Sequence, residues 1–190
     1  MIRVSSVVVI AALALGGCDS APADGVQQGA VEAPAEAGPG AGGEILRTRA
    51  GEAIPAMTVV DPDGARLDLA AIGQPVLLNL WATWCGPCKV EMPQLDALAG
   101  ELAGEVRVLA VSQDIQGAEK VVPFFAEQGF DNLEPWMDTQ TELGVKLAEG
   151  GMLPTTILYD AEGREVFRVA GIYEWDGEEA IAQIREALAQ

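Results

Sequence analysis

The chain of 190 residues contains no histidine, and this absence excludes several chemistries at once. No Ser-His-Asp or Cys-His nucleophile is possible without it. Zinc sites with a histidine ligand are excluded too, and three cysteines cannot complete a four-cysteine site. Because Lys89 follows Cys88, a covalent haem site of the Cys-x-x-Cys-His type is also excluded. We therefore expect neither a metal nor another cofactor.

Basic residues are scarce as well. The 11 Lys and Arg residues stand against 29 Asp and Glu residues, which gives a formal net charge of -18. Binding to nucleic acid needs a basic face for the phosphates, and no basic stripe is visible in the sequence. Nucleic acid is therefore excluded as a partner, and the surplus of acid indicates solubility rather than a particular ligand.

The N-terminus lacks an apolar run of about 20 residues, the length that spans a membrane. Instead, a basic start is followed by a short apolar run over residues 7–15 and by two glycines before Cys18. This order is typical of an export signal. An ordinary cleaved signal with a coincidental cysteine and an uncleaved anchor are the alternatives to a signal that is cut at Cys18.

The segment after Cys18 is rich in Ala, Gly, Pro, Glu and Gln and has almost no large apolar residues. Such a segment buries too little apolar surface to offset the entropy of ordering it. We therefore predict three parts: an export signal over residues 1–17, a flexible linker over 18–50 that begins with Cys18, and a single domain over 51–190.

Within the predicted domain, strand and helix patterns alternate. An α/β domain with a central mixed sheet covered by helices on both faces is expected from this order. Strands are predicted over residues 57–60, 66–69, 76–82, 106–112, 133–137, 155–159 and 165–170, and helices from the cysteine pair to about residue 102, over 118–128, over 139–148 and over 176–189.

Cys85 and Cys88 lie where the buried strand 76–82 meets the following helix. A thiol at a helix N-terminus has a lowered pKa, because unsatisfied backbone N–H groups and the helix dipole favour negative charge there. Two intervening residues, Gly86 and Pro87, bring the second sulfur close enough to form a disulfide. The spacing therefore predicts a redox-active pair. A structural disulfide is the alternative, but structural bridges usually close longer loops.

The run Trp-Ala-Thr-Trp-Cys-Gly-Pro-Cys-Lys over residues 81–89 resembles the active site of the thioredoxin superfamily. Pro93 matches the helix-kinking proline of that superfamily, and residues 153–156 match its cis-proline loop. Within the superfamily, the chain resembles the membrane-anchored TlpA/ResA-like reductases in its export signal, its linker and the run from Cys85 to Pro93. The resemblance implies a thioredoxin-like three-layer fold with extra N-terminal strands and a central insertion.

The same resemblance implies roles for individual residues. Cys85 is expected to attack a client disulfide as a thiolate, and Cys88 to resolve the mixed disulfide. Trp84, Gly86 and Pro87 complete the active-site motif. The client strand is expected to dock on Leu153, Pro154 and Thr155.

Asn79 stands where thioredoxins carry a buried aspartate beneath the redox pair, and a neutral amide cannot accept a proton there. Glu91 lies three residues after Cys88 and therefore on the same helical face. We expect Glu91 to take over as the proton acceptor. The alternative is that Glu91 is a solvated surface residue.

Leu15 to Cys18 resembles the bacterial lipobox, in which the cysteine carries a diacylglycerol group. Such a modification would hold the protein at a membrane. Asp19 weakly resembles a signal for retention in the inner membrane. The resemblance therefore implies a lipid-anchored protein on the periplasmic side of a bacterial membrane, with the inner membrane favoured.

Reduction of disulfides is the expected direction, because Gly-Pro between the cysteines is the thioredoxin dipeptide and thioredoxin is a strong reductant. By resemblance, the clients are disulfide-containing proteins such as apocytochrome c or respiratory copper-site assembly proteins. Electrons would come from a transmembrane thiol donor of the DsbD/CcdA type. A disulfide-forming oxidase or isomerase is one alternative. A non-enzymatic copper carrier is another, against which the two-residue spacing and the absence of histidine argue.

Overall fold

The computed structural model describes residues 43–190. The predicted export signal, Cys18 and most of the predicted linker lie outside the described residues. Among the helices of residues 43–190, none is both long and apolar enough to cross a membrane.

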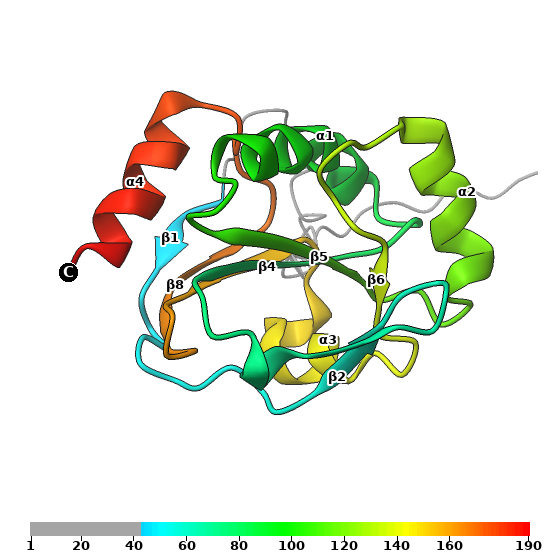
Figure 1. The fold of residues 1–190 in the computed structure, drawn as a ribbon, viewed down its shortest axis with the longest axis horizontal. Helices are drawn as coiled ribbons and strands as arrows, with labels where there is room; N and C mark the ends of the chain where they lie inside the picture. Colours follow the sequence, from blue (N-terminus) through cyan, green and yellow to red (C-terminus); the bar gives the residue numbers. More distant parts are fainter. Residues whose placement is uncertain (1–42) are drawn as a thin grey trace, which may run out of the picture. The chain divides into compact units, whose positions relative to one another are not determined.

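An eight-stranded mixed sheet forms the centre of the domain (Figure 1). Its strands are β1 (Ile45–Leu46), β2 (Thr58–Val60), β3 (Arg66–Asp68), β4 (Val76–Trp81), β5 (Arg107–Ser112), β6 (Trp136–Met137), β7 (Thr155–Tyr159) and β8 (Glu165–Ala170). They lie side by side in the order β1-β8-β7-β4-β5-β6-β2-β3. β4 runs parallel to β5 and antiparallel to β7, which confirms the predicted mixed sheet.

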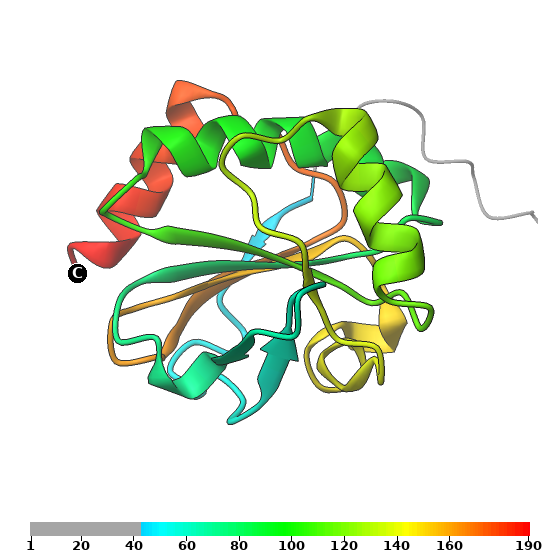
Figure 2. The same ribbon diagram turned by 45° about the vertical axis from the view of Figure 1, so that its right-hand side comes forward.

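Helices cover both faces of this sheet, so the domain has three layers (Figures 1 and 2). The helices are α1 (Gly86–Glu101), α2 (Ala118–Gln128), α3 (Glu142–Leu147) and α4 (Glu178–Leu188), with the short 3-10 helices η1 (Leu69–Ala71) and η2 (Glu149–Gly151). Buried side chains of α1, α2 and α4 join one core cluster, and those of α3 and η1 join a second.

The central strand β4 shows why the sequence folds this way. All six of its residues are buried, because α1 covers one face of the sheet and α3 the other. A strand that is buried on both faces needs an almost continuous apolar sequence, as residues 76–81 have. Asn79 is the polar exception in β4, and its side-chain amide donates a hydrogen bond to Glu91 of α1.

Three elements differ clearly from the sequence-based prediction, and the first is β6, which covers only the last two residues of the predicted strand 133–137. α3 is shorter than the predicted helix 139–148, because Thr141 adopts a left-handed conformation before it and Ala148 is extended after it. β1 lies inside the predicted linker, where it pairs antiparallel with β8. Two residues are too few to give an alternating pattern, so composition alone places the start of the domain too late. The folded region includes residues 43–50.

Candidate active site

The cysteine pair lies at one edge of the sheet, where several strand ends meet. β4 ends at Trp81, beside Ser112 at the end of the parallel strand β5. β7 runs antiparallel to β4 and begins at Thr155, next to Leu80. The loops 82–85, 113–117 and 152–154 therefore leave the sheet at the same edge, which we call the cysteine edge.

Cys85 and Cys88 are joined by a disulfide with an S–S distance of 2.03 Å. Cys85 is the N-cap residue of α1, and its sulfur accepts a hydrogen bond from the backbone N–H of Cys88 at 3.2 Å. Cys85 is 5% exposed, whereas Cys88 is 0% exposed. Of the two cysteines, only Cys85 has any exposed surface through which another protein could reach it.

The start of α1 is suited to hold a thiolate. The first turn of this helix of 16 residues contains no acidic side chain, and the exposed Lys89 adds a positive charge there. Pro87 fits the first turn because its missing N–H would have no helical partner in any case. The helix dipole and the free N–H groups therefore favour negative charge on Cys85 once the disulfide is reduced.

Glu91 is completely buried in the same helix, with an exposure of 0%. Its Oε1 accepts a hydrogen bond from Nδ2 of Asn79 at 2.8 Å, and its Oε2 accepts one from the backbone N–H of Tyr173 at 3.3 Å. Asn79 Nδ2 also donates to Oγ1 of Thr156 at 2.9 Å. The alternative that Glu91 is a solvated surface residue is therefore wrong.

Burial raises the pKa of Glu91 from its ordinary value of 4.5 to about 7. The hydrogen bonds from Tyr173 and Asn79 oppose this shift but do not cancel it. The indole N–H of Trp175 lowers the pKa as well, although it donates no hydrogen bond to Glu91. A carboxyl group with a pKa near neutral can both take up and release a proton, as a general acid–base catalyst must.

The loop before β7 supplies the second wall of the cysteine edge. The Leu153–Pro154 peptide bond is cis, and the carbonyl of Pro154 accepts a hydrogen bond from Gly171 N at 2.9 Å. Thr155 Oγ1 donates to the carbonyl of Met152 at 2.8 Å. Leu153 packs against both core clusters, one of which includes the cysteine pair. The structure thus brings residues 153–155 to the edge that carries Cys85.

Large apolar side chains are exposed on all three loops of the cysteine edge. Trp84 is 69% exposed, Ile115 76% and Met152 52%. Gly86 and Pro87 are exposed as well. Exposed apolar groups of this size at one edge are typical of a surface that contacts another protein.

Two polar contacts of the site are not predicted by the sequence, although Thr156 belongs to the predicted cis-proline loop. Thr156 contacts Asn79 from a position 77 residues away. Asp114 follows β5, and its carboxylate accepts hydrogen bonds from the backbone N–H of Thr83 at 2.9 Å and from the Thr83 hydroxyl at 2.7 Å. It thereby fixes the turn that leads to Cys85. A buried acid directly after an apolar strand could have drawn attention to Asp114.

The chain is similar in sequence to known proteins. The Redoxin family model matches residues 49–183 of the chain. The thiol-disulfide oxidoreductase ResA of Bacillus cereus is 31% identical over 122 residues, which cover 64% of this chain and 69% of that protein. A second ResA, from Oceanobacillus iheyensis, is 38% identical over 92 residues, which cover 48% of this chain and 46% of that protein.

Solved structures share the fold. The pneumococcal exposed lipoprotein thioredoxin Etrx1 from Streptococcus pneumoniae has a TM-score of 0.56 and 26% identity, covering 68% of this chain and 98% of that chain. StoA from Bacillus subtilis has a TM-score of 0.56 and 22% identity, covering 72% and 98%, and shows likeness of fold alone. The predicted thioredoxin-like fold is therefore confirmed. From this fold and these matches, the chain belongs to the Redoxin family and is a ResA-like thiol-disulfide oxidoreductase of the thioredoxin superfamily.

Proposed function

We propose that this protein is a lipid-anchored oxidoreductase on the periplasmic side of a bacterial membrane, where it reduces the disulfides of client proteins through Cys85 and Cys88. One observation carries the chemical part of the proposal. The two cysteines form a disulfide at the N-terminus of α1, and Cys85 alone of the pair has any exposed surface through which a partner could reach it.

Reduction proceeds in two exchange steps. The Cys85 thiolate attacks one sulfur of the client disulfide, the client S–S bond breaks, and the other client sulfur leaves as a thiolate that takes up a proton. Cys88 then loses its proton and attacks the Cys85 sulfur of the mixed disulfide. The second client sulfur leaves and is protonated. The client has gained two electrons, and the enzyme disulfide has formed.

Glu91 is the acceptor of the Cys88 proton in this scheme. It follows Cys88 by one helical turn, both side chains are 0% exposed, and its pKa of about 7 lets it release the proton again near neutral pH. Asn79 holds the carboxylate through its amide N–H. Three positions supply the docking surface for the client strand: Leu153, Pro154 and Thr155 bind its backbone, beside Trp84 on the opposite loop.

The location rests on the N-terminal sequence. We propose an export signal over residues 1–17, a diacylglycerol group on Cys18 and a linker that lets the domain reach clients near the membrane. One similar solved structure is that of an exposed lipoprotein, which supports this proposal. The clients would be apocytochrome c or respiratory copper-site assembly proteins, and a donor of the DsbD/CcdA type would return the enzyme to its reduced state.

Trapping of clients tests the function and the order of attack together. Cys88→Ser should accumulate mixed disulfides through Cys85, because the resolving thiol is missing. Cys85→Ser is the matched control and should trap nothing. Equal trapping by both variants would contradict the assigned order.

The reduction potential tests the direction. A reductase should lie near the value of thioredoxin, about -270 mV, whereas a strong oxidant such as DsbA lies at about -120 mV. Equilibration of the reduced and oxidised protein with glutathione buffers measures this potential. A value close to that of DsbA would favour the oxidase alternative.

Membrane fractionation tests the anchor. The full chain should partition into the detergent phase, and Cys18→Ala should release it or block its processing. An unchanged soluble distribution of both proteins would remove the proposal that Cys18 is lipidated.

A further inference from the structure

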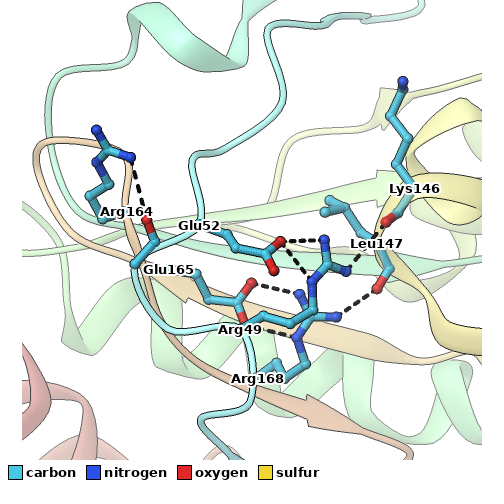
Figure 3. A network of polar contacts seen from close by, with 8 residues as sticks. Arg49, Glu52, Lys146, Leu147, Arg164, Glu165 and Arg168 are labelled. Carbon is cyan, nitrogen blue, oxygen red and sulfur yellow. Dashed lines mark hydrogen bonds and ion pairs between the residues drawn. The ribbon is translucent and has the colours of Figure 1, made fainter.

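Glu165 and Arg168 form a buried ion pair that takes no part in the thiol–disulfide exchange. Arg168 on β8 is 2% exposed, and its guanidinium contacts both carboxylate oxygens of Glu165, at 2.7 and 2.5 Å. The two residues are three positions apart on the same strand, and both side chains are almost fully enclosed. Figure 3 shows the pair together with its neighbours.

The pair is directed at the C-terminal end of α3. Nη1 of Arg168 donates a hydrogen bond to the carbonyl oxygen of Leu147 at 2.8 Å. Nη1 of Arg49 donates to the carbonyl oxygen of Lys146 at 3.3 Å, and Glu52 holds Arg49 in turn (Figure 3). The last carbonyls of a helix have no partners within it, and cations stabilise that end. Two arginines therefore cap a helix of six residues.

The other end of α3 is held at the cysteine edge. The backbone N–H of Leu143 donates to Asp138 at 2.7 Å, and that of Gly144 donates to Gln113 at 3.0 Å. Gln113 directly follows β5, and Asp138 directly follows β6. α3 is thus fixed at both ends by buried polar side chains.

The chain beyond α3 leads directly to the docking loop. Ala148 is buried, η2 follows, and the cis peptide bond between Leu153 and Pro154 comes before β7. The carbonyl that Arg168 binds is therefore seven residues before Pro154. A change in the position of Leu147 would move the start of this short connection.

Stability alone does not explain why charges are buried here. Removing two charges from water is costly, and a well-packed apolar pair of similar volume is often as stable. An apolar pair could not, however, donate a directed hydrogen bond to the Leu147 carbonyl. What the ion pair supplies is a fixed direction, because Glu165 holds both the Nε and Nη2 sides of the guanidinium while Nη1 reaches α3.

We propose that Arg168, oriented by Glu165, is a positioning residue for client docking: it fixes the C-terminal end of α3 and through it the connection to Leu153, Pro154 and Thr155. Arg49 is a second, more exposed donor to the same helix end. This inference rests on the proposed function, because it takes residues 153–155 as the docking surface for the client.

The experiment compares two substrates: a protein disulfide, which must dock on residues 153–155, and a small disulfide, which can react without docking. The variant Glu165→Leu/Arg168→Leu replaces the pair without leaving a lone buried charge. Its reduction of insulin should show a KM raised about 10-fold, since small misplacements of a positioning contact have effects of this order or larger. Its reaction with the small aromatic disulfide dithionitrobenzoate, which needs no docked strand, should proceed at the wild-type rate.

The matched control is Glu105→Leu/Arg185→Leu. This pair is also joined by two hydrogen bonds, at 2.8 and 2.7 Å, but it is half-exposed and connects α4 to the loop before β5. It should leave both reactions unchanged. An insulin KM at the wild-type value in the Glu165/Arg168 variant would overturn the inference, as would an equal rise in the control.

If the variant Glu165→Leu/Arg168→Leu does not fold, Arg49→Gln tests whether the C-terminal end of α3 positions the docking loop. It removes the exposed donor to the Lys146 carbonyl and should raise the insulin KM about 2-fold, within the range found for contacts that act at a distance. No rise would overturn the inference. Cys85→Ser separates this outcome from failure of the proposed function: it should reduce neither disulfide, and activity in that variant would contradict the role of Cys85 itself.

Discussion

Glu91 on α1 and Glu165 on β8 are both buried glutamates, with exposures of 0% and 3%, but they are stabilised in opposite ways. Glu165 contacts the guanidinium of Arg168 through both of its oxygens. Within residues 43–190, Glu91 has no ion-pair partner and accepts only hydrogen bonds from an amide and a backbone N–H. Of these two buried glutamates, one therefore has a matching cation and the other does not.

The two environments give the two carboxylates different properties. A buried carboxylate without a cation has a raised pKa, so Glu91 exchanges a proton near neutral pH. A buried carboxylate that binds a guanidinium on both sides fixes the position of its partner. These properties fit the two proposed roles, proton transfer for Glu91 and positioning of Arg168 for Glu165. Each of the following substitutions tests one side of this contrast.

The largest effect is expected for Glu91→Gln. Loss of the proton acceptor should slow reduction of a protein disulfide by about 10²- to 10⁴-fold at most, while loss of the nearby negative charge should lower the Cys85 pKa. The substitution nearly preserves size, so the fold should survive. Stopped-flow reduction of insulin and pH titration of thiol alkylation measure the two effects. An unchanged rate together with an unchanged Cys85 pKa would mean that the proton acceptor is another group.

The second largest effect is expected on the unfolding free energy when Glu165 loses its partner. Arg168→Leu leaves Glu165 buried without its cation, which should cost about 3 to 5 kcal/mol of unfolding free energy. Glu165→Leu/Arg168→Leu should recover most of this loss, because no lone charge is then buried. Urea denaturation measures both variants. A single variant no less stable than the double one would contradict the account of the pair.

The third effect is a pH dependence that only Glu91 should produce. Its pKa is raised from 4.5 in the unfolded chain to about 7 in the folded protein, so the native state holds the proton more tightly. Stability from this group is complete below pH 4.5 and is lost as the pH rises to 7, by about 3 kcal/mol. The difference in unfolding free energy between the oxidised wild type and Glu91→Gln should follow this curve. A difference that is constant between pH 4.5 and 7 would rule out the raised pKa.

The smallest effect on stability is expected at Arg49. Its ion pair with Glu52 at 2.6 Å resembles the buried one in chemistry, but the two side chains are 27% and 50% exposed. Solvent screens such a pair, and surface ion pairs contribute little. Arg49→Gln should therefore shift the urea midpoint by a small fraction of the shift caused by Arg168→Leu. Equal shifts of the urea midpoint would show that burial does not change how much such an ion pair contributes to stability.

The sequence predicts the parts of the site that are close together in the chain. The apolar run of β4, the cysteine pair and Glu91 lie within residues 76–91, so strand length and helical spacing place them correctly. The contacts that determine the state of Glu91 could not be predicted in this way. Tyr173 is 82 residues from Glu91, and Thr156 is 77 residues from Asn79.

The burial of the Glu165–Arg168 ion pair could not be predicted from the local sequence pattern either. Glu165 and Arg168 lie in a strand and look like ordinary charged residues of a half-exposed edge. Their burial results from β1, which pairs with β8, and from α3, which supplies the Leu147 carbonyl 21 residues away. The sequence pattern does not predict β1, and the contact with Leu147 joins residues far apart in the chain, so the pair could not be identified as buried.

The most direct test of the contrast between the two glutamates is a pH titration of the side-chain carboxyl ¹³C signals in the oxidised protein. One glutamate signal should titrate near pH 7, and this signal should be absent from Glu91→Gln but present in Glu165→Leu/Arg168→Leu. If no glutamate titrates above pH 6, or if the signal near pH 7 persists in Glu91→Gln, then Glu91 is not the buried proton-exchanging carboxylate.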